Sequence, residues 1–349
     1  MHFASDNWAG AHPKIAGNLV RHAGGFAAAY GASDLDNAVE KIFCEIFERE
    51  VAVFFVATGT AANALSVTAA SRPGGLFFAH REAHLVEDEC GAPEYLSGGT
   101  RLHPVDGELS RIDPQKLGAA IGQFDPAFIH AGQPVGVSIT QSTEIGTVYS
   151  LAEIDAIAGI CRDNGLPLHM DGARFANALV SLGTTPAEMT WRRGVDFLSF
   201  GGTKNGCWCA EALVVLDPAK VGEIPFLRKR AAHLFSKSRF IAAQFQAYFE
   251  DDLWLETARH SNAMAARLAG HFAASGTVRL AWKPEANEVF GIMARETAGA
   301  FQSKGAIFHP WKTPHGFAGE IGEDETLCRF VTSFATTADD VDRFGDLIA

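Results

Sequence analysis

Two short apolar segments near the middle of the chain each end abruptly on polar residues. Leu166–Met170 runs directly into Asp171, and Phe197–Phe200 is followed by Gly-Gly-Thr and then Lys204. Both segments are predicted to be β-strands with helical sequence between them, which is typical of an α/β fold. Ligands of open α/β sheets collect at the carboxyl ends of the strands. The pattern therefore predicts that an acid and an amine face one ligand site.

Pyridoxal phosphate (PLP) chemistry uses this pair of side chains. A lysine forms a Schiff base with the cofactor aldehyde, and an aspartate keeps the pyridine nitrogen protonated. Each residue alone also fits a structural role, because Asp171 could cap a helix and Lys204 could be a solvated loop residue. Glycines at 201, 202 and 206 permit close backbone approach. Together with these glycines, the pair favours a cofactor site.

The segments His169–Arg174 and Ser199–Gly206 resemble the cofactor motifs of the low-specificity L-threonine aldolases. Members of this family are fold-type-I PLP enzymes related to the β-eliminating lyases. The resemblance implies a large α/β domain with a mostly parallel seven-stranded sheet and a small α+β C-terminal domain. It also implies PLP as the cofactor.

The domain boundaries expected from this resemblance divide the chain into three parts. Residues 1–30 would form an N-terminal arm that contributes to the site, and residues 31–240 would form the large PLP-binding domain. Residues 241–349 would form a helical connection and the small domain. The sequence contains no internal repeat and no glycine-serine linker.

A predicted strand at Val51–Val56 leads into Thr58-Gly59-Thr60, and a helix is expected from Ala61. A turn between a strand and a helix N-terminus binds anions, because unpaired N–H groups and the helix dipole face it. The segment also resembles the phosphate-binding turn of the family. We therefore expect Gly59 and Thr60 to bind the cofactor phosphate.

Two histidines match histidines of the family active site. The resemblance implies that His84 stacks on the pyridine ring, and an imidazole there could also reach a substrate hydroxyl, as a base or as a positioning group. His130, at the end of a strand expected at Ala127–His130, would contact the β-hydroxyl of the substrate, although a structural role is equally compatible with the sequence. The acids that follow His84 cannot converge from one helix face, so no metal site is predicted.

The remaining site residues are carried over from the family by their positions in its motifs. The resemblance implies that Ser5, Arg174 and Arg329 bind the substrate carboxylate, for which the guanidinium fork is well suited. It implies that Tyr30 lines the site, from the neighbouring subunit, and that basic residues reach the cofactor phosphate across a dimer interface. Arg230 and Lys237 match those positions, in a homodimer or homotetramer with shared active sites, and Arg174 is also expected to be a cofactor-binding residue.

Composition narrows the possible partners. A net charge of −12 argues against nucleic acid and anionic membranes, which attract basic surfaces. The six cysteines show no zinc-type spacing, and neither a signal peptide nor a membrane span is evident, so a cytoplasmic protein is expected.

The resulting functional hypothesis is retro-aldol cleavage of L-β-hydroxy-α-amino acids, such as threonine, allo-threonine and phenylserine, to glycine and an aldehyde. Lys204, His84, Asp171 and His130 are the predicted catalytic residues. A β-eliminating lyase or a glycine hydroxymethyltransferase-like enzyme would use the same electron sink and is the alternative. A PLP-binding protein without turnover is a remote third possibility.

Overall fold

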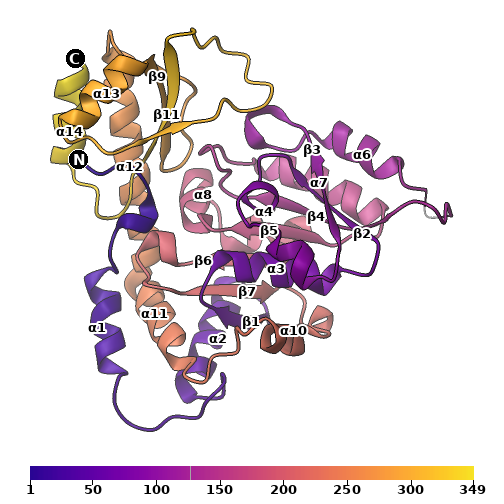
Figure 1. Cartoon of the computed structure of the whole chain (residues 1–349). Helices are drawn as coiled ribbons and strands as arrows, with labels where there is room; N and C mark the ends of the chain where they lie inside the picture. The colour runs from indigo at the N-terminus through magenta and orange to yellow at the C-terminus, as the bar shows by residue number, and fades with distance from the viewer. Residues whose placement is uncertain (126) are drawn as a thin grey trace.

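The computed structural model describes residues 1–125 and 127–349 and contains two β-sheets (Figure 1). The larger sheet has seven strands in the order β1-β7-β6-β5-β4-β2-β3. Only β7 runs antiparallel to its neighbours, so the predicted mostly parallel seven-stranded sheet is confirmed. The strands are β1 (Ala52–Val56), β2 (Gly75–His80), β3 (Arg101–Val105), β4 (Gln133–Thr140), β5 (Leu168–Gly172), β6 (Phe197–Gly201) and β7 (Glu211–Val215).

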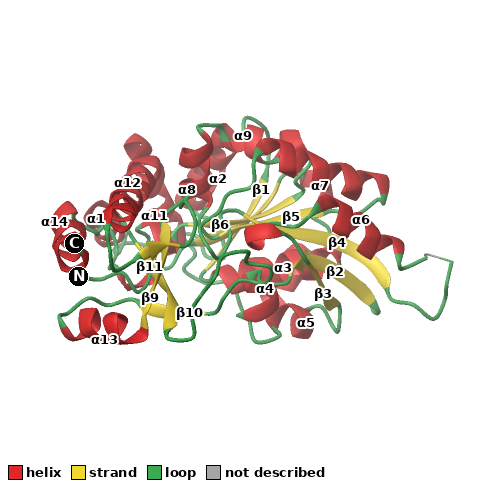
Figure 2. Cartoon of the chain, turned by 90° about the horizontal axis from the view of Figure 1, so that it is seen from above, coloured by secondary structure: helices red, strands yellow, loops and turns green. Residues whose placement is uncertain are grey.

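Helices cover both faces of the larger sheet (Figure 2). This arrangement explains why β5, β6 and β7 are buried along their whole length and are mostly apolar. One face is covered by α2 (Asp34–Ile46), α6 (Pro114–Gly122), α7 (Leu151–Asp163), α8 (Phe175–Leu182) and α9 (Pro186–Met189), and the other by α3 (Gly59–Ala70), α4 (His84–Glu87) and α5 (Ala92–Leu96). Aromatic side chains fill the core between α2, β6 and the helix α11 (Arg239–Phe249), where the ring of Phe43 lies 5.2 Å from Phe200 and 5.3 Å from Phe245.

The second sheet is antiparallel, with the order β10-β11-β9-β8. Its strands are β8 (Arg279–Leu280), β9 (Glu288–Ala294), β10 (His309–Trp311) and β11 (Glu325–Val331), and its helices are α13 (Arg295–Ser303) and α14 (Ala338–Ile348). The 22-residue helix α12 (Leu253–Ala274) contacts both this sheet and α8, which covers the larger sheet. None of the helices in the described part of the chain has the length and hydropathy needed to cross a bilayer.

The N-terminus belongs to the core of the second sheet. Phe3 is fully buried there, and its carbonyl oxygen accepts a 2.8 Å hydrogen bond from the Val331 N–H. The chain then passes through the short 3-10 helix η1 (Asp6–Trp8) and a helix that the sequence did not predict, α1 (Pro13–Arg21), which packs on α11. The first residues of the chain therefore pack against both parts of the molecule. The predicted domain boundaries remain predictions.

The strand predicted at Ala127–His130 is wrong. The Asp125 side chain accepts a 2.8 Å hydrogen bond from the Ala127 N–H, and the Asp125 carbonyl accepts a 2.9 Å bond from the Phe128 N–H. Side-chain hydrogen bonding of this kind favours a turn over a strand. The strand begins instead at Gln133, and β3 is a further strand that the sequence did not predict.

Candidate active site

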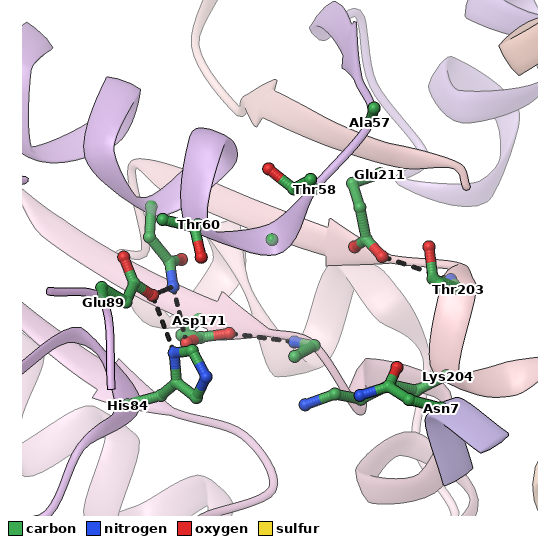
Figure 3. Close-up of a pocket in the computed structure, with 13 residues that line it drawn as sticks. Asn7, Ala57, Thr58, Thr60, His84, Glu89, Asp171, Thr203, Lys204 and Glu211 are labelled. Carbon is green, nitrogen blue, oxygen red and sulfur yellow. Dashed lines mark hydrogen bonds and ion pairs between the residues drawn. The ribbon is translucent and has the colours of Figure 1, made fainter. Parts of the chain in front are cut away.

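A cavity of about 240 Å³ lies at the edge of the larger sheet where β5 and β6 end (Figure 3). The polypeptide segments that line it come from η1, from the turn after β1, from α3 and α4, from the ends of β5 and β6 and the residues that follow them, and from the first residue of β7. The lining residues are Asn7, Ala57, Thr58, Gly59, Thr60, Asn63, His84, Glu89, Asp171, Ala173, Thr203, Lys204 and Glu211. The structure thus brings together five residues that the sequence predicted for the site: Gly59, Thr60, His84, Asp171 and Lys204.

Asp171 is buried at the end of β5, and both of its carboxylate oxygens are held. One oxygen accepts a 2.9 Å hydrogen bond from the Asn63 side-chain amide, and the other accepts a 3.0 Å bond from the Ala173 N–H. A carboxylate with fixed oxygens keeps one orientation toward the cavity. Asn63 had no predicted role, although its position in the first turns of α3 was a signal that it could face the same site.

Lys204 lies in the short 3-10 helix η4 (Thr203–Asn205), which follows β6. The glycine at the end of β6 explains how this segment comes close to Asp171. A Cβ atom at Gly201 would stand 2.5 Å from the Ala173 carbonyl oxygen, so only glycine permits this contact. The tight contact brings the amine of Lys204 and the carboxylate of Asp171 to the same cavity (Figure 3).

The N-terminus of α3 forms another wall of the cavity. Thr58 caps the helix, and its hydroxyl accepts a 3.2 Å hydrogen bond from the Ala61 N–H. The backbone at Gly59 and Thr60 starts the first helical turn and carries the positive end of the helix dipole. This wall is suited to an anionic group, as the sequence predicted.

A hydrogen-bonded network joins His84 to the pocket floor. The Glu89 carboxylate lies 3.0 Å from His84 Nδ1 and accepts a 2.7 Å bond from the Asn63 amide, which also bonds Asp171. The hydrogen bond to Glu89 raises the pKa of His84, against the lowering effect of burial, and burial raises the pKa of Glu89 itself. We call Asn63, His84, Glu89 and Asp171 the inner wall of the cavity.

Glu211 is a third acid in the cavity, and the sequence analysis missed it. It accepts a 3.2 Å hydrogen bond from the Thr203 N–H, and burial raises its pKa to about 7. Because β7 runs antiparallel, its first residue lies at the same edge as the ends of β5 and β6. A lone acid at the start of an otherwise apolar strand was the available signal.

The arginines predicted to bind a substrate carboxylate lie in a buried group of charges beside the cavity. Arg174 donates hydrogen bonds of 2.7 and 3.1 Å to Asp6 and lies 3.3 Å from Glu288. Arg329 lies 3.7 Å from Glu288, and its guanidinium carbon is 3.9 Å from the centre of the Trp311 ring. We call Asp6, Arg174, Glu288 and Arg329 the arginine cluster. Ser5, predicted to act with these arginines, caps η1 through a 3.1 Å bond from the Asn7 N–H.

Four other predicted residues do not line the cavity within one chain. Tyr30 is 54% exposed, and Arg230, at the end of α10 (Ile224–Arg230), has a side chain that is 66% exposed. Lys237 is exposed beside Trp208, and His130 is exposed in the loop before β4. Within a single chain, these four side chains therefore do not contribute to the cavity.

Comparison with known proteins agrees with this geometry. The family model for β-eliminating lyases matches residues 2–296. The chain is 37% identical to the low-specificity L-threonine aldolase of Pseudomonas aeruginosa, over 99% of this chain and 95% of the relative. It is 38% identical to the enzyme of the same name from a Pseudomonas species, over 88% of each chain. The structure of Leishmania major threonine aldolase superposes with a TM-score of 0.91 at 28% identity, covering 99% of this chain and 98% of that one. The fold is thus that of the fold-type-I enzymes, and the chain belongs to the β-eliminating lyase family and, within it, to the threonine aldolases.

Proposed function

We propose that this protein is a PLP-dependent carbon–carbon lyase that cleaves L-β-hydroxy-α-amino acids to glycine and an aldehyde. The observation that carries the proposal is the meeting of Asp171, Lys204 and the N-terminus of α3 at one cavity. The similarity to threonine aldolases along the whole chain supports the same activity.

The residues of the cavity fit the cofactor. The Lys204 amine can hold the aldehyde carbon covalently, the Asp171 carboxylate can accept a hydrogen bond from the ring N–H, and the first turn of α3 can bind the phosphate. Bound PLP supplies an electron sink for the pair of electrons left when the bond between Cα and Cβ breaks. Asp171 makes this possible by keeping a proton on the ring nitrogen, and Asn63 holds Asp171 in place.

His84 is the proposed base for the β-hydroxyl proton. Glu89 accepts the hydrogen on Nδ1, which leaves Nε2 as the basic nitrogen. About a third of the His84 side chain, 32%, remains exposed, so a substrate hydroxyl can reach it. Removing that proton allows the β-carbon to leave as an aldehyde.

The substrate carboxylate is assigned to Arg329, assisted by Arg174 and Ser5. Arg329 is the freer of the two guanidinium groups, because its Nε has no hydrogen-bond partner among the described residues, whereas Arg174 is engaged by Asp6. Threonine, allo-threonine and phenylserine are the proposed substrates.

A second copy of the chain completes the site in this proposal. The cavity-lining residues include three acids, Glu89, Asp171 and Glu211, but no arginine and a single lysine, Lys204. A phosphate dianion in such a place requires additional cations. We assign them to Arg230 and Lys237 of a neighbouring subunit, with Tyr30 and His130 also acting across an interface of a homodimer or homotetramer.

The free thiols of all six cysteines support a reducing, cytoplasmic environment.

The test is product analysis with L-threonine and L-phenylserine supplied separately. Glycine with acetaldehyde or benzaldehyde is the expected outcome, and a 2-oxo acid with ammonia would instead indicate a β-eliminating lyase. Replacing Lys204 with alanine should lower turnover by about three orders of magnitude or more. If Lys204→Ala retained full activity, the assignment of Lys204 would be wrong.

A further inference from the structure

Glu288 is a buried carboxylate whose bonding is incomplete. Its side chain is 0% exposed at the start of β9, and neither carboxylate oxygen has a hydrogen-bond partner among the described residues. Buried polar groups are almost always hydrogen-bonded, so an exception of this kind requires an explanation. The proposed reaction steps above leave Glu288 without a role.

The groups that face Glu288 come from four elements. Arg174 follows β5 and lies 3.3 Å away, and Arg329 lies in β11 at 3.7 Å. Asp6 in η1 and Glu144 in the loop after β4 add negative charge nearby. Burial raises the pKa of Glu288 to about 7, although the two arginines act in the opposite direction.

The two acids of the arginine cluster, Asp6 and Glu288, differ in how strongly their surroundings favour the ionised carboxylate. Burial alone would raise the pKa of Asp6, but Arg174, Lys204 and hydrogen bonds from Arg174 and Asn287 lower it below its usual value. Asp6 therefore stays ionised, whereas Glu288 lies in ion-pair range of two arginines without a hydrogen bond to either. If a proton enters the cluster, Glu288 is the group that receives it.

The charge balance of the arginine cluster predicts when Glu288 takes up a proton. Two arginines offset Asp6 and Glu288, so the cluster has no spare positive charge for another anion. A substrate carboxylate at Arg329 would add a negative charge in a buried place, where an uncompensated charge is costly. Protonation of Glu288 removes this excess and frees the Arg329 guanidinium for the new carboxylate.

We propose that Glu288 is a positioning residue that holds Arg174 and Arg329 until an amino-acid carboxylate binds, and that it takes up a proton as this carboxylate replaces it. The inference rests on the proposed function in two respects, that the ligand is an α-amino acid and that its carboxylate binds at Arg329. Its consequence is that carboxylate affinity falls as the pH rises above 7. This follows because ligand binding must then draw the proton from solution.

Calorimetric titration of the cofactor-loaded protein with glycine, in two buffers of different ionisation enthalpy, counts the protons taken up. At pH 8 we expect the wild type to take up about one more proton per site than Glu288→Gln, and at pH 6 this difference should be small. Glycinamide, which lacks the carboxylate, should show no such difference between the proteins. Between pH 7 and pH 8 the glycine affinity of the wild type should fall by up to about tenfold relative to Glu288→Gln.

Two further variants separate a titrating role from a structural one. Glu288→Asp keeps a titratable carboxyl and should retain the proton uptake. Glu325→Gln removes an acid from the same sheet, where it lies 2.8 Å from Arg279 away from the cavity, and should behave as the wild type. Equal proton uptake by the wild type and Glu288→Gln at pH 8 would overturn the proposal.

If Glu288→Gln fails to fold, an experiment on the wild type alone tests the proposal. Addition of glycine at pH 8 should produce the infrared carbonyl band of a protonated carboxylic acid, and its absence would contradict the inference. The proposed function is tested separately by aldehyde release. A protein that releases no aldehyde but takes up the proton would overturn the function and uphold the role of Glu288.

Discussion

The inner wall of the cavity and the basic segment that contains Arg230 and Lys237 differ in how much one chain completes. Asn63 alone donates to Glu89 at 2.7 Å and to Asp171 at 2.9 Å, so the inner wall is held together within a single subunit. Arg230 and Lys237 are exposed and do not line the cavity of their own chain. In the proposed assembly, folding of one chain therefore preorganises the ring end of the cofactor site, and the phosphate end is completed by a neighbouring subunit.

The largest effect is expected at the inner wall, from Asp171→Asn. An amide at 171 cannot keep the ring nitrogen protonated, so kcat should fall by about 10³-fold, as when another preorganised electrostatic group is removed from an active site. Cofactor affinity should change much less, because the phosphate wall is untouched. Steady-state kinetics at saturating PLP, together with a PLP binding curve, measures both quantities. An Asp171→Asn variant that kept its kcat would contradict the proposed role of Asp171 at the ring nitrogen.

An intermediate effect is expected in the basic segment. Arg230→Ala and Lys237→Ala should each weaken PLP binding by about tenfold to a hundredfold, the value of a charged hydrogen bond, with a smaller effect on kcat at saturating PLP. Arg192→Ala, which removes an exposed arginine paired with Glu48 and Glu188, is the matched control and should leave the affinity unchanged.

Mixing subunits then shows where these cations act. Lys204→Ala and the double variant Arg230→Ala/Lys237→Ala should each have little activity at low PLP. Hybrids made by co-expression should recover up to about a quarter of the wild-type activity, because half of the dimers are mixed and each mixed dimer has one intact site. Failure to recover any activity, with hybrids shown to form, would mean that the cations act within their own chain.

The smallest expected effect is on the pH profile of kcat/KM, and it tests the role of His84 in the inner wall. His84 must be unprotonated to accept the hydroxyl proton, so activity is lost as the pH falls through its raised pKa. Glu89→Gln removes the main cause of that raised value, so the acid limb of kcat/KM should move to lower pH. The plateau should fall by about tenfold, equivalent to about 1.4 kcal/mol, since the amide orients the imidazole less firmly. An unchanged acid limb would exclude His84 as the titrating base.

Local sequence was sufficient where the site is built from strand ends and helix ends. The apolar segments before Asp171 and Lys204 and the turn at Gly59 predicted three walls of the cavity, because each depends on a short stretch of backbone. Two strands of the large sheet were missed: β4, which starts beside a proline, and β3, a short edge strand that itself contains a proline. For these strands, pairing with neighbours outweighed local preference.

Long-range contacts set the remainder of the site, and the sequence carried no signal for most of them. Arg174 meets Asp6 from 168 residues away, and it meets Glu288 only because β9 of the second sheet lies beside the larger one. Such pairs follow from how the two sheets pack, which periodicity and spacing do not encode. The family prediction, by contrast, was confirmed, because it rested on motifs that keep their order along the whole chain.

The most direct test of the central assignment is to reduce the PLP-loaded protein with borohydride, digest it and locate the pyridoxyl group by mass spectrometry. We predict that the group is found on the peptide that contains Lys204 and that Lys204→Ala carries none. A pyridoxyl group on a different lysine, or no labelling of a protein that binds PLP, would contradict the account.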